Sequence, residues 1–249
     1  TPTEVSLVSS WGSGSGSSSS SSSSSSWGPI VAATWATDID SFVSTWTTSN
    51  SGQGNNSQIR LPLHSSWTFN FTVDWWDGTS DVITSYNQAE RVHTYASAGT
   101  YTVVIDGQID GFSYDDEGSS NRKMTQISQW GTLGLADTGQ QFAYTTFEVT
   151  AEDRGEFASV TNTQNMFHWS VISWNFTNLD FSSLVNVNYM FYSTVINATL
   201  NNWTLTSLTN GTEMFAAWNN NNYGATINAS LAGLDLSGIT NGAEMFKRL

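Results

Sequence analysis

The chain has 249 residues, of which 38% are hydrophobic and 13% aromatic, so it can bury a core and is not a disordered polymer. Seven Lys and Arg against 21 Asp and Glu give a net charge of −14, which disfavours nucleic acids and anionic membranes as partners. The chain has no cysteine, which excludes disulfides, thiolate metal sites and cysteine nucleophiles.

Residues 1–37 are predicted to form an N-terminal arm. A Gly/Ser tract at 12–26 lies between Trp11 and Trp27. Such tracts are usually flexible linkers, but the flanking tryptophans favour an arm held by a neighbouring chain or by sugar on its hydroxyls. Because the chain begins at Thr1 and has no apolar run of transmembrane length, we expect an exported protein whose signal peptide has been removed. The alternative is a sequence that was shortened experimentally.

Two β-strands are predicted next, at 67–75 and 100–107. Both segments are rich in Thr, Val, Tyr and Trp, and they alternate apolar with polar residues wholly or in part. The pair Asp77-Gly78 after the first strand is a hairpin signal. Several short strands at this spacing predict an antiparallel β-sandwich over residues 38–125.

The stretch "VDWWDGTSDV…RVHTYASAGTYTVVIDG" resembles the polycystic-kidney-disease (PKD) domain, an immunoglobulin-like sandwich. The hairpin lacks the Phe-Gly pair of the usual motif, so the resemblance is to a PKD-like domain. The matching positions are Trp75 or Trp76, Asp77, Gly78 and Thr79 in the hairpin, and His93, Tyr95, Gly99, Tyr101, Thr102 and Val103 in the later strand.

A nine-residue phrase recurs four times in the C-terminal half, each time ending in Met-Phe. The last three intervals between its phenylalanines are 24, 24 and 31 residues, and Phe142 stands 25 residues before the first as a degenerate repeat. An Asn lies five residues before each Phe, where we expect it to bond backbone groups inside the turn. The repeat positions are Phe142, Met166, Phe167, Met190, Phe191, Met214, Phe215, Met245, Phe246, Asn162, Asn186, Asn210 and Asn241.

Recurring apolar columns with one Asn, at a period of about 24 residues, are typical of a short leucine-rich-repeat solenoid, here over residues 126–249. Together with the predicted sandwich, this makes the expected fold class all-β dominated. The longer last interval predicts a loop near 218–226. The phrases "NWTLTSLTNGTEMF" and "GLDLSGITNGAEMF" resemble the BspA-like leucine-rich-repeat surface proteins, and "ISQWGTL" resembles the phrase that joins a PKD-like segment to their repeats. This resemblance implies a secreted or cell-surface protein used in adhesion, attachment or extracellular structures.

The sequence contains no HExxH, GxSxG or P-loop phrase, so we predict no enzymatic activity and no cofactor. His93 falls in the PKD-like motif, where a structural hydrogen bond is expected, and His64 and His168 have no partner at a recognisable spacing. Calcium is a candidate at two acidic clusters, although solvated turn residues are the alternative. The clusters are Asp106, Asp110, Asp115, Asp116 and Glu117, and Asp74, Asp77 and Asp81.

N-x-S/T sequons indicate candidate glycosylation sites, and recurring tryptophans indicate a candidate contact surface. Candidate glycosylation sites are Asn55, Asn70, Asn175, Asn197, Asn202 and Asn228, with Asn228 the first choice. Asn210 also has the sequon but belongs to the repeat column. Trp169, Trp174, Trp203 and Trp218 recur in the repeats, where they either pack in the core or line one face against sugar rings or a partner chain.

Two functions follow as expectations. The first is an extracellular structural protein that self-assembles with copies of itself, or with other surface proteins, into a filament or surface layer. Its N-terminal arm and an uncapped end of the repeats would make the contacts. The alternative is an adhesin or glycan-binding surface module that uses exposed tryptophans and calcium.

Overall fold

A computed structural model describes residues 38–249 except 53, 115–121, 135–138, 154, 156, 174–179, 198–199, 201–202, 204, 219–225, 229 and 232. The arm at 1–37 and most of the loop expected at 218–226 therefore lie outside the described residues. Strands dominate the described part, where the helical element is one turn, η2 (Ala89–Arg91), so the expected all-β class is confirmed. No helix in this part has the length and hydrophobicity that crossing a bilayer requires.

The first half of the described chain, residues 38–130, is called here the antiparallel region. Side chains alternate between core and surface along β1, where Phe42, Ser44 and Trp46 are buried. β1 lies between β6 and β7, and β3 lies between β6 and β4. The strands of this region are β1 (Phe42–Thr47), β2 (Gln58–Arg60), β3 (Phe69–Asp74), β4 (Ser80–Ile83), β5 (Val92–Thr94), β6 (Thr100–Ile109) and β7 (Met124–Gln129), of which β2 and β5 form a separate pair.

The β3–β4 turn carries a network of side chains that includes Trp75, Asp77, His93 and Tyr95. Gly78 has a φ of 91°, and the Asp77 carboxylate accepts a hydrogen bond from the Thr79 amide at 3.1 Å. His93 Nε2 lies 2.8 Å from the other Asp77 oxygen, and its ring stacks on Trp75 with centroids 4.7 Å apart. The Tyr95 hydroxyl donates to the Trp75 carbonyl at 3.1 Å, so the β2–β5 pair is tied to the end of β3.

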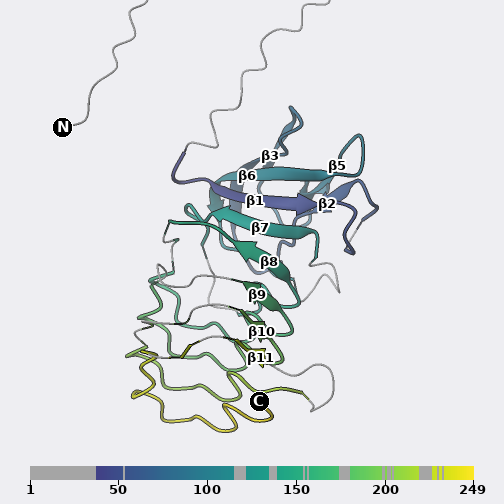
Figure 1. Cartoon of the computed structure of the whole chain (residues 1–249). Coiled ribbons are helices and arrows are strands. Elements are labelled where there is room, and N and C mark those ends of the chain that lie inside the picture. Colours follow the sequence, from purple (N-terminus) through teal and green to yellow (C-terminus); the bar gives the residue numbers. More distant parts are fainter. Residues whose placement is uncertain are drawn as a thin grey trace, which may run out of the picture. The chain divides into compact units, whose positions relative to one another are not determined.

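The second half, residues 139–249, is called here the repeat region. Its short strands β8 (Thr146–Val149), β9 (Val171–Ser173), β10 (Val195–Ile196) and β11 (Thr226–Ile227) pair in parallel, one after another. β8 pairs in parallel with β7, so in the described residues one sheet runs in the order β11-β10-β9-β8-β7-β1-β6-β3-β4 (Figure 1). β7 thus contains the expected boundary at 125/126 and is hydrogen-bonded on both of its edges.

The phenylalanines of the repeats form a ladder through the core of the repeat region. Their rings stack nearly parallel, with centroid separations of 5.9, 5.5, 5.5 and 5.4 Å from Phe142 through to Phe246. The neighbouring Met166, Met190 and Met214 are fully buried. Phe246 differs from the other rungs because it is 45% exposed: Phe215 covers one face of its ring, and no described residue stacks on the other.

The asparagine column forms a second ladder at the surface of the turns. The Oδ1 atoms of Asn162, Asn186 and Asn241 each accept the backbone N–H two residues later, at 3.1 to 3.3 Å. Isolated parallel bridges connect Asn162, Asn186, Asn210 and Asn241 in sequence. The side chain therefore closes each turn in the way expected from its spacing, although Asn241 is exposed.

The segment between the two regions is fixed by one carboxylate. Asp153 accepts hydrogen bonds from the Trp130 and Gly131 amides at 2.7 to 3.0 Å. The buried Trp130 ring packs edge-on against Phe142 and Phe157. The phrase "ISQWGTL" therefore supplies both a shared strand and the aromatic contact that begins the phenylalanine ladder.

Candidate functional site

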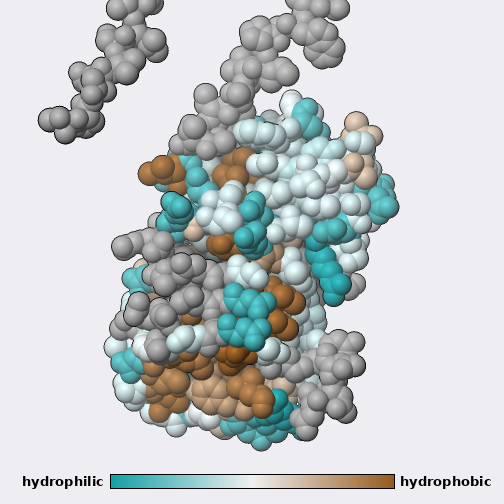
Figure 2. Space-filling view, in the orientation of Figure 1, coloured by the Kyte–Doolittle hydropathy of each residue, from teal (hydrophilic) through white to brown (hydrophobic). Residues whose placement is uncertain are grey.

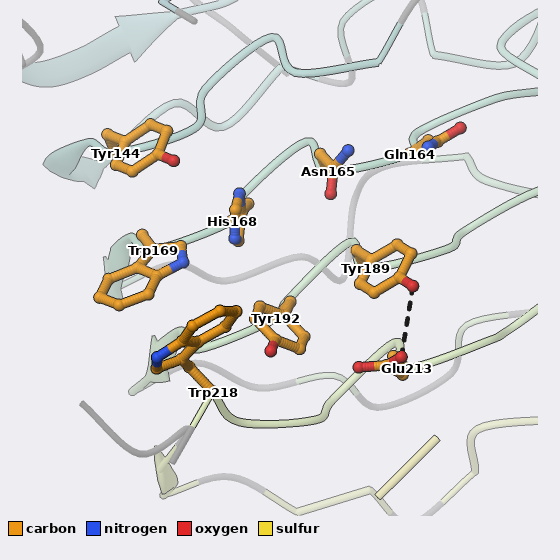
Figure 3. A pocket seen from close by; sticks show the side chains of 9 residues that line it. All are labelled: Tyr144, Gln164, Asn165, His168, Trp169, Tyr189, Tyr192, Glu213 and Trp218. Atoms are coloured by element: carbon orange, nitrogen blue, oxygen red, sulfur yellow. Dashed lines mark hydrogen bonds between the residues drawn. The ribbon is translucent and has the colours of Figure 1, made fainter. Parts of the chain in front are cut away.

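An open groove of about 700 Å³ crosses the turns of the repeat region (Figure 3). Its side chains come from four consecutive coils, which we name after their ladder residues Phe142, Phe167, Phe191 and Phe215. Most of the lining side chains are aromatic, and the others are amides and one carboxylate. The lining residues are Tyr144, Gln164, Asn165, His168, Trp169, Tyr189, Tyr192, Glu213 and Trp218.

Backbone conformation aims several of these side chains outward. Asn165, Trp169, Tyr189 and Glu213 have φ values of 57°, 57°, 56° and 50°, in the left-handed region that glycine occupies without penalty. Bulky residues pay about 1 kcal/mol or more for this conformation. The same conformation recurs at equivalent turn positions outside the lining, at Gln140, Ser193, Glu244 and Arg248, so it is a property of the turns that the repeats share.

Aromatic rings make a continuous row along the groove. His168 lies 5.4 Å from Tyr144 and 5.4 Å from Tyr192, and Tyr192 lies 5.5 Å from Tyr189, all between ring centroids. Tyr144 is 41% exposed, so at this end of the row the ring is open to a ligand. A row of partly exposed aromatic side chains is a common feature of recognition surfaces.

Two tryptophans line the same end of the groove (Figure 3). Trp169 comes from the Phe167 coil and Trp218 from the Phe215 coil, while the coil between them places the small Ser193 at the corresponding turn. The Trp218 amide donates to the Ser193 hydroxyl at 2.9 Å, and the Arg248 guanidinium donates to the Trp218 carbonyl. These bonds fix the backbone of Trp218 while its side chain remains outside the core, with the residue 59% exposed.

The opposite end of the groove is polar. The Tyr189 hydroxyl donates to Glu213 Oε1 at 3.2 Å, as the dashed line in Figure 3 shows. Burial and the adjacent Glu213 carboxylate raise the pKa of Tyr189. Gln164 and Asn165 contribute amide groups from the Phe167 coil, so this end offers both donors and acceptors to a ligand.

His168 occupies the middle of the aromatic row. Burial lowers the pKa of His168 to about 4, so its imidazole is uncharged at neutral pH. A neutral ring there adds surface and one donor to the groove and no positive charge.

The four tryptophans named from the sequence have different environments. Trp169 and Trp218 line the groove, whereas Trp203 is buried, with its ring 4.7 Å from Phe181 and 6.1 Å from Phe191. Trp174 lies outside the described residues. On the face shown in Figure 2, hydrophobic residues reach the surface over the repeat region, and the antiparallel region is mostly pale or hydrophilic.

The carboxylates proposed for calcium mostly bond to nearby protein groups. Asp74, Asp81 and Asp110 accept hydrogen bonds from Trp76 N, Trp75 Nε1 and Thr68 N at 2.7 to 2.8 Å. Within the described ranges no three His, Asp or Glu side chains gather as metal ligands do. Asp115, Asp116 and Glu117 are outside those ranges.

The described glycosylation candidates, Asn55, Asn70, Asn197 and Asn228, are all exposed. Asn197 and Asn228 directly follow the paired strands β10 and β11, and Asn228 Nδ2 donates to Asn197 Oδ1 at 2.8 Å. Asn55 Oδ1 accepts hydrogen bonds from the amide and hydroxyl of Ser57, the serine of its own sequon. Asn175 and Asn202 lie outside the described residues.

Most of the groove was not predicted from the sequence. Tyr144, His168 and Tyr192 stand one or two residues after a ladder phenylalanine, so an aromatic residue just past the Met-Phe anchor was the available signal. The signal is weak because these residues differ from coil to coil, whereas the ladder positions recur.

Comparisons with protein-family models, with curated protein sequences and with solved structures found no match to this chain. The binding properties of the groove must therefore be inferred from its own side chains.

Proposed function

We propose that the protein is a secreted or cell-surface recognition protein of the adhesive class, and that the groove of the repeat region is its binding surface. The observation that carries this proposal is the row of partly exposed aromatic rings from successive coils. Rigid aromatic side chains give large contact areas at low entropic cost, which is why they dominate binding surfaces.

The proposal treats the antiparallel region as a PKD-like domain and the repeat region as a short BspA-like leucine-rich-repeat solenoid. The Trp75–His93–Asp77 network and the phenylalanine and asparagine ladders support this interpretation. A binding role without catalysis fits the lining residues. Glycosidase chemistry needs two carboxylates across the bond, and Glu213 is the one carboxylate among the described lining residues.

Binding to arrays of extracellular-matrix proteins and of glycans tests this function. The double variant Tyr144→Ala/Tyr192→Ala removes two rings of the row, and Trp76→Ala/Tyr86→Ala removes two exposed aromatics of the antiparallel region as a matched control. We expect binding to at least one extracellular ligand that falls about tenfold or more in the first variant and is unchanged in the second. Equal binding by both variants, or no binding by the wild type, would overturn the proposal.

Self-assembly into a filament or layer is the second candidate, and the coil of Phe246 favours it. In the preceding coil the Gly211, Glu213 and Phe215 amides donate to carbonyls of the Phe246 coil at 2.9 to 3.0 Å. The corresponding amides of Gly242, Glu244 and Phe246 have no acceptor among the described residues. A following segment or a second copy of the chain can use these donors.

Electron microscopy of the purified protein tests this candidate. We expect regular filaments from the wild type and dispersed particles from Phe246→Asp, which places a charge on the exposed rung. Val185→Asp is the matched control. Val185 is 41% exposed and Phe246 is 45% exposed, but Val185 belongs to an inner coil. Dispersed wild-type particles would remove the candidate.

A further inference from the structure

The main-chain amides of the described lining residues are already hydrogen-bonded within the protein. The amides of Asn165, Trp169 and Tyr189 donate to carbonyls of the next coil at 3.0 to 3.1 Å, as the amides of Gln140 and Tyr144 do one coil earlier. Strand addition by a peptide needs unpaired main-chain donors and acceptors. A ligand in this groove must therefore be recognised by side chains.

The charge of the lining suits an uncharged ligand. No Lys or Arg is among the described lining residues; Arg248 and Lys247 lie near Tyr192 but are opposed there by Glu213 and Glu244, and His168 is neutral. Glu213 already accepts the Tyr189 hydroxyl. The whole chain carries a net charge of −14. This net charge disfavours an anionic ligand such as a phosphate or sulfate ester, and a cation would depend on Glu213.

The groove offers aromatic ring faces on one side and hydroxyl-binding groups on the other, each contributed by more than one coil. Paired strands lie about 4.8 Å apart, which is close to the length of one sugar unit in an extended β-linked chain. Trp169 and Trp218 offer apolar faces at one end, and the amides of Gln164 and Asn165 with Glu213 offer donors and acceptors at the other (Figure 3). Pyranose rings present the same combination, with apolar C–H faces and hydroxyl edges.

We propose that this groove binds a neutral, extended glycan chain that runs across the coils, with a sugar ring against Trp169 and Trp218 and hydroxyls bonded by Gln164, Asn165 and Glu213. This proposal rests on the function of the groove as the recognition surface, and it adds the class of ligand and its direction. A chain in this direction meets a new coil with each sugar unit, so affinity increases with chain length until the groove is filled.

Calorimetric titration of the full chain with neutral oligosaccharides tests the proposal. The probes are gluco-, xylo-, manno- and chito-oligosaccharides with two and with six units. We expect at least one hexasaccharide to bind, about tenfold or more tighter than its disaccharide. Trp169→Ala and Trp218→Ala each weaken the hexasaccharide about tenfold. Trp76→Ala, which removes a 42% exposed Trp with a φ of 62° outside the groove, leaves binding unchanged.

Two further variants separate this ligand class from others. Glu213→Gln keeps a hydrogen-bonding side chain without the charge, so sugar binding changes less than about threefold, whereas a cationic ligand would lose most of its affinity. Trp218→Phe keeps an aromatic face and recovers part of the binding if Trp218→Ala disturbs the turn. No oligosaccharide binding at millimolar concentration overturns the glycan proposal. Groove-dependent binding of a matrix protein in that case would leave the proposed function standing.

Discussion

At the scale of single residues, partly buried titratable side chains make the stability of the protein depend on pH. His168 is the clearest case, since its ring lies among Tyr144, Trp169 and Tyr192 and burial keeps its pKa near 4. His168 therefore becomes protonated at a lower pH in the folded state than in the unfolded chain, where its pKa is 6.5.

This difference predicts a loss of stability on mild acidification. Between pH 6.5 and about 4 the unfolded state binds the His168 proton and the folded state does not, so stability falls as the pH decreases through this window. His168→Gln removes the titrating group, and we expect its urea-unfolding free energy to fall less than that of the wild type from pH 7 to pH 5. An equal decrease in unfolding free energy in His168→Gln and in the wild type would show that His168 does not cause the loss of stability.

The Asp77 carboxylate, which pairs with His93, gives a pH dependence in the same direction but from a different cause. Partial burial acts to raise the pKa of Asp77, but hydrogen bonds from Thr79 and His93 outweigh it and hold the value below 3.8. Stability from this carboxylate is therefore present above the unfolded pKa and is lost as the pH falls through the lower folded value. We expect Asp77→Asn to cost about 0.5–1 kcal/mol at pH 7 and less at pH 3, by urea unfolding.

A charge-removal control is available for the same measurement. Glu90→Gln removes an exposed carboxylate of η2 that makes no hydrogen bond among the described residues. We expect it to change stability by less than about 0.5 kcal/mol at neutral pH. A cost for Glu90→Gln equal to that of Asp77→Asn would assign the effect to net charge and not to the β3–β4 turn.

At the scale of elements, the phenylalanine ladder shows how position within a repeat sets its energetic weight. Phe191 is fully buried between Phe167 and Phe215, whereas Phe246 stacks on one face and is 45% exposed. We expect Phe191→Ala to cost about 3–5 kcal/mol because it opens a cavity in the core. Phe246→Ala removes a half-exposed ring and should cost about 1 kcal/mol. Chemical denaturation of the two variants measures both values, and equal costs would mean that another molecule covers Phe246.

The sequence was most informative where a residue type must recur. Phe191 and Asn186 were assigned to a core position and a turn position from their spacing, because every coil has to meet the next at the same points. Asp77-Gly78 likewise marks its hairpin through local turn chemistry. β3 and β6 lie close to the predicted ranges 67–75 and 100–107.

Neither the groove nor the sharing of β7 between the two regions could be predicted from recurring residue types or from local turn chemistry. His168 and Tyr192 occupy equivalent turns but are different residues, and the next equivalent position is Ala216, so an alignment of the repeats treats them as variable. The double pairing of β7 depends on long-range register, which periodicity within one segment does not encode. Trp203 illustrates the same limit, since its burial is set by contacts with Phe181 and Phe191 and not by its own repeat position.

At the scale of the whole described molecule, β7 joins the two regions through hydrogen bonds on both edges. Thr45 of β1 is opposite Gln126, and Gln126 is opposite Glu148 of β8. Ile127 on the same strand is fully buried in the common core. A strand shared in this way makes the unfolding of one region cost contacts in the other, so we expect both to unfold in one cooperative transition.

Ile127→Ala tests this coupling. Removal of a buried Ile costs about 2–5 kcal/mol, and because β7 serves both regions the loss should weaken hydrogen-exchange protection in β6 and in β9 alike. Ile172→Ala in β9 provides the comparison: Ile172 is also buried, but its strand pairs within the repeat region. If the two regions are coupled, denaturation of either variant remains a single transition seen equally by tryptophan fluorescence and by circular dichroism. If Ile127→Ala instead exposes the amides of β9 while those of β6 stay protected, the regions unfold separately, and β7 belongs energetically to the antiparallel region alone.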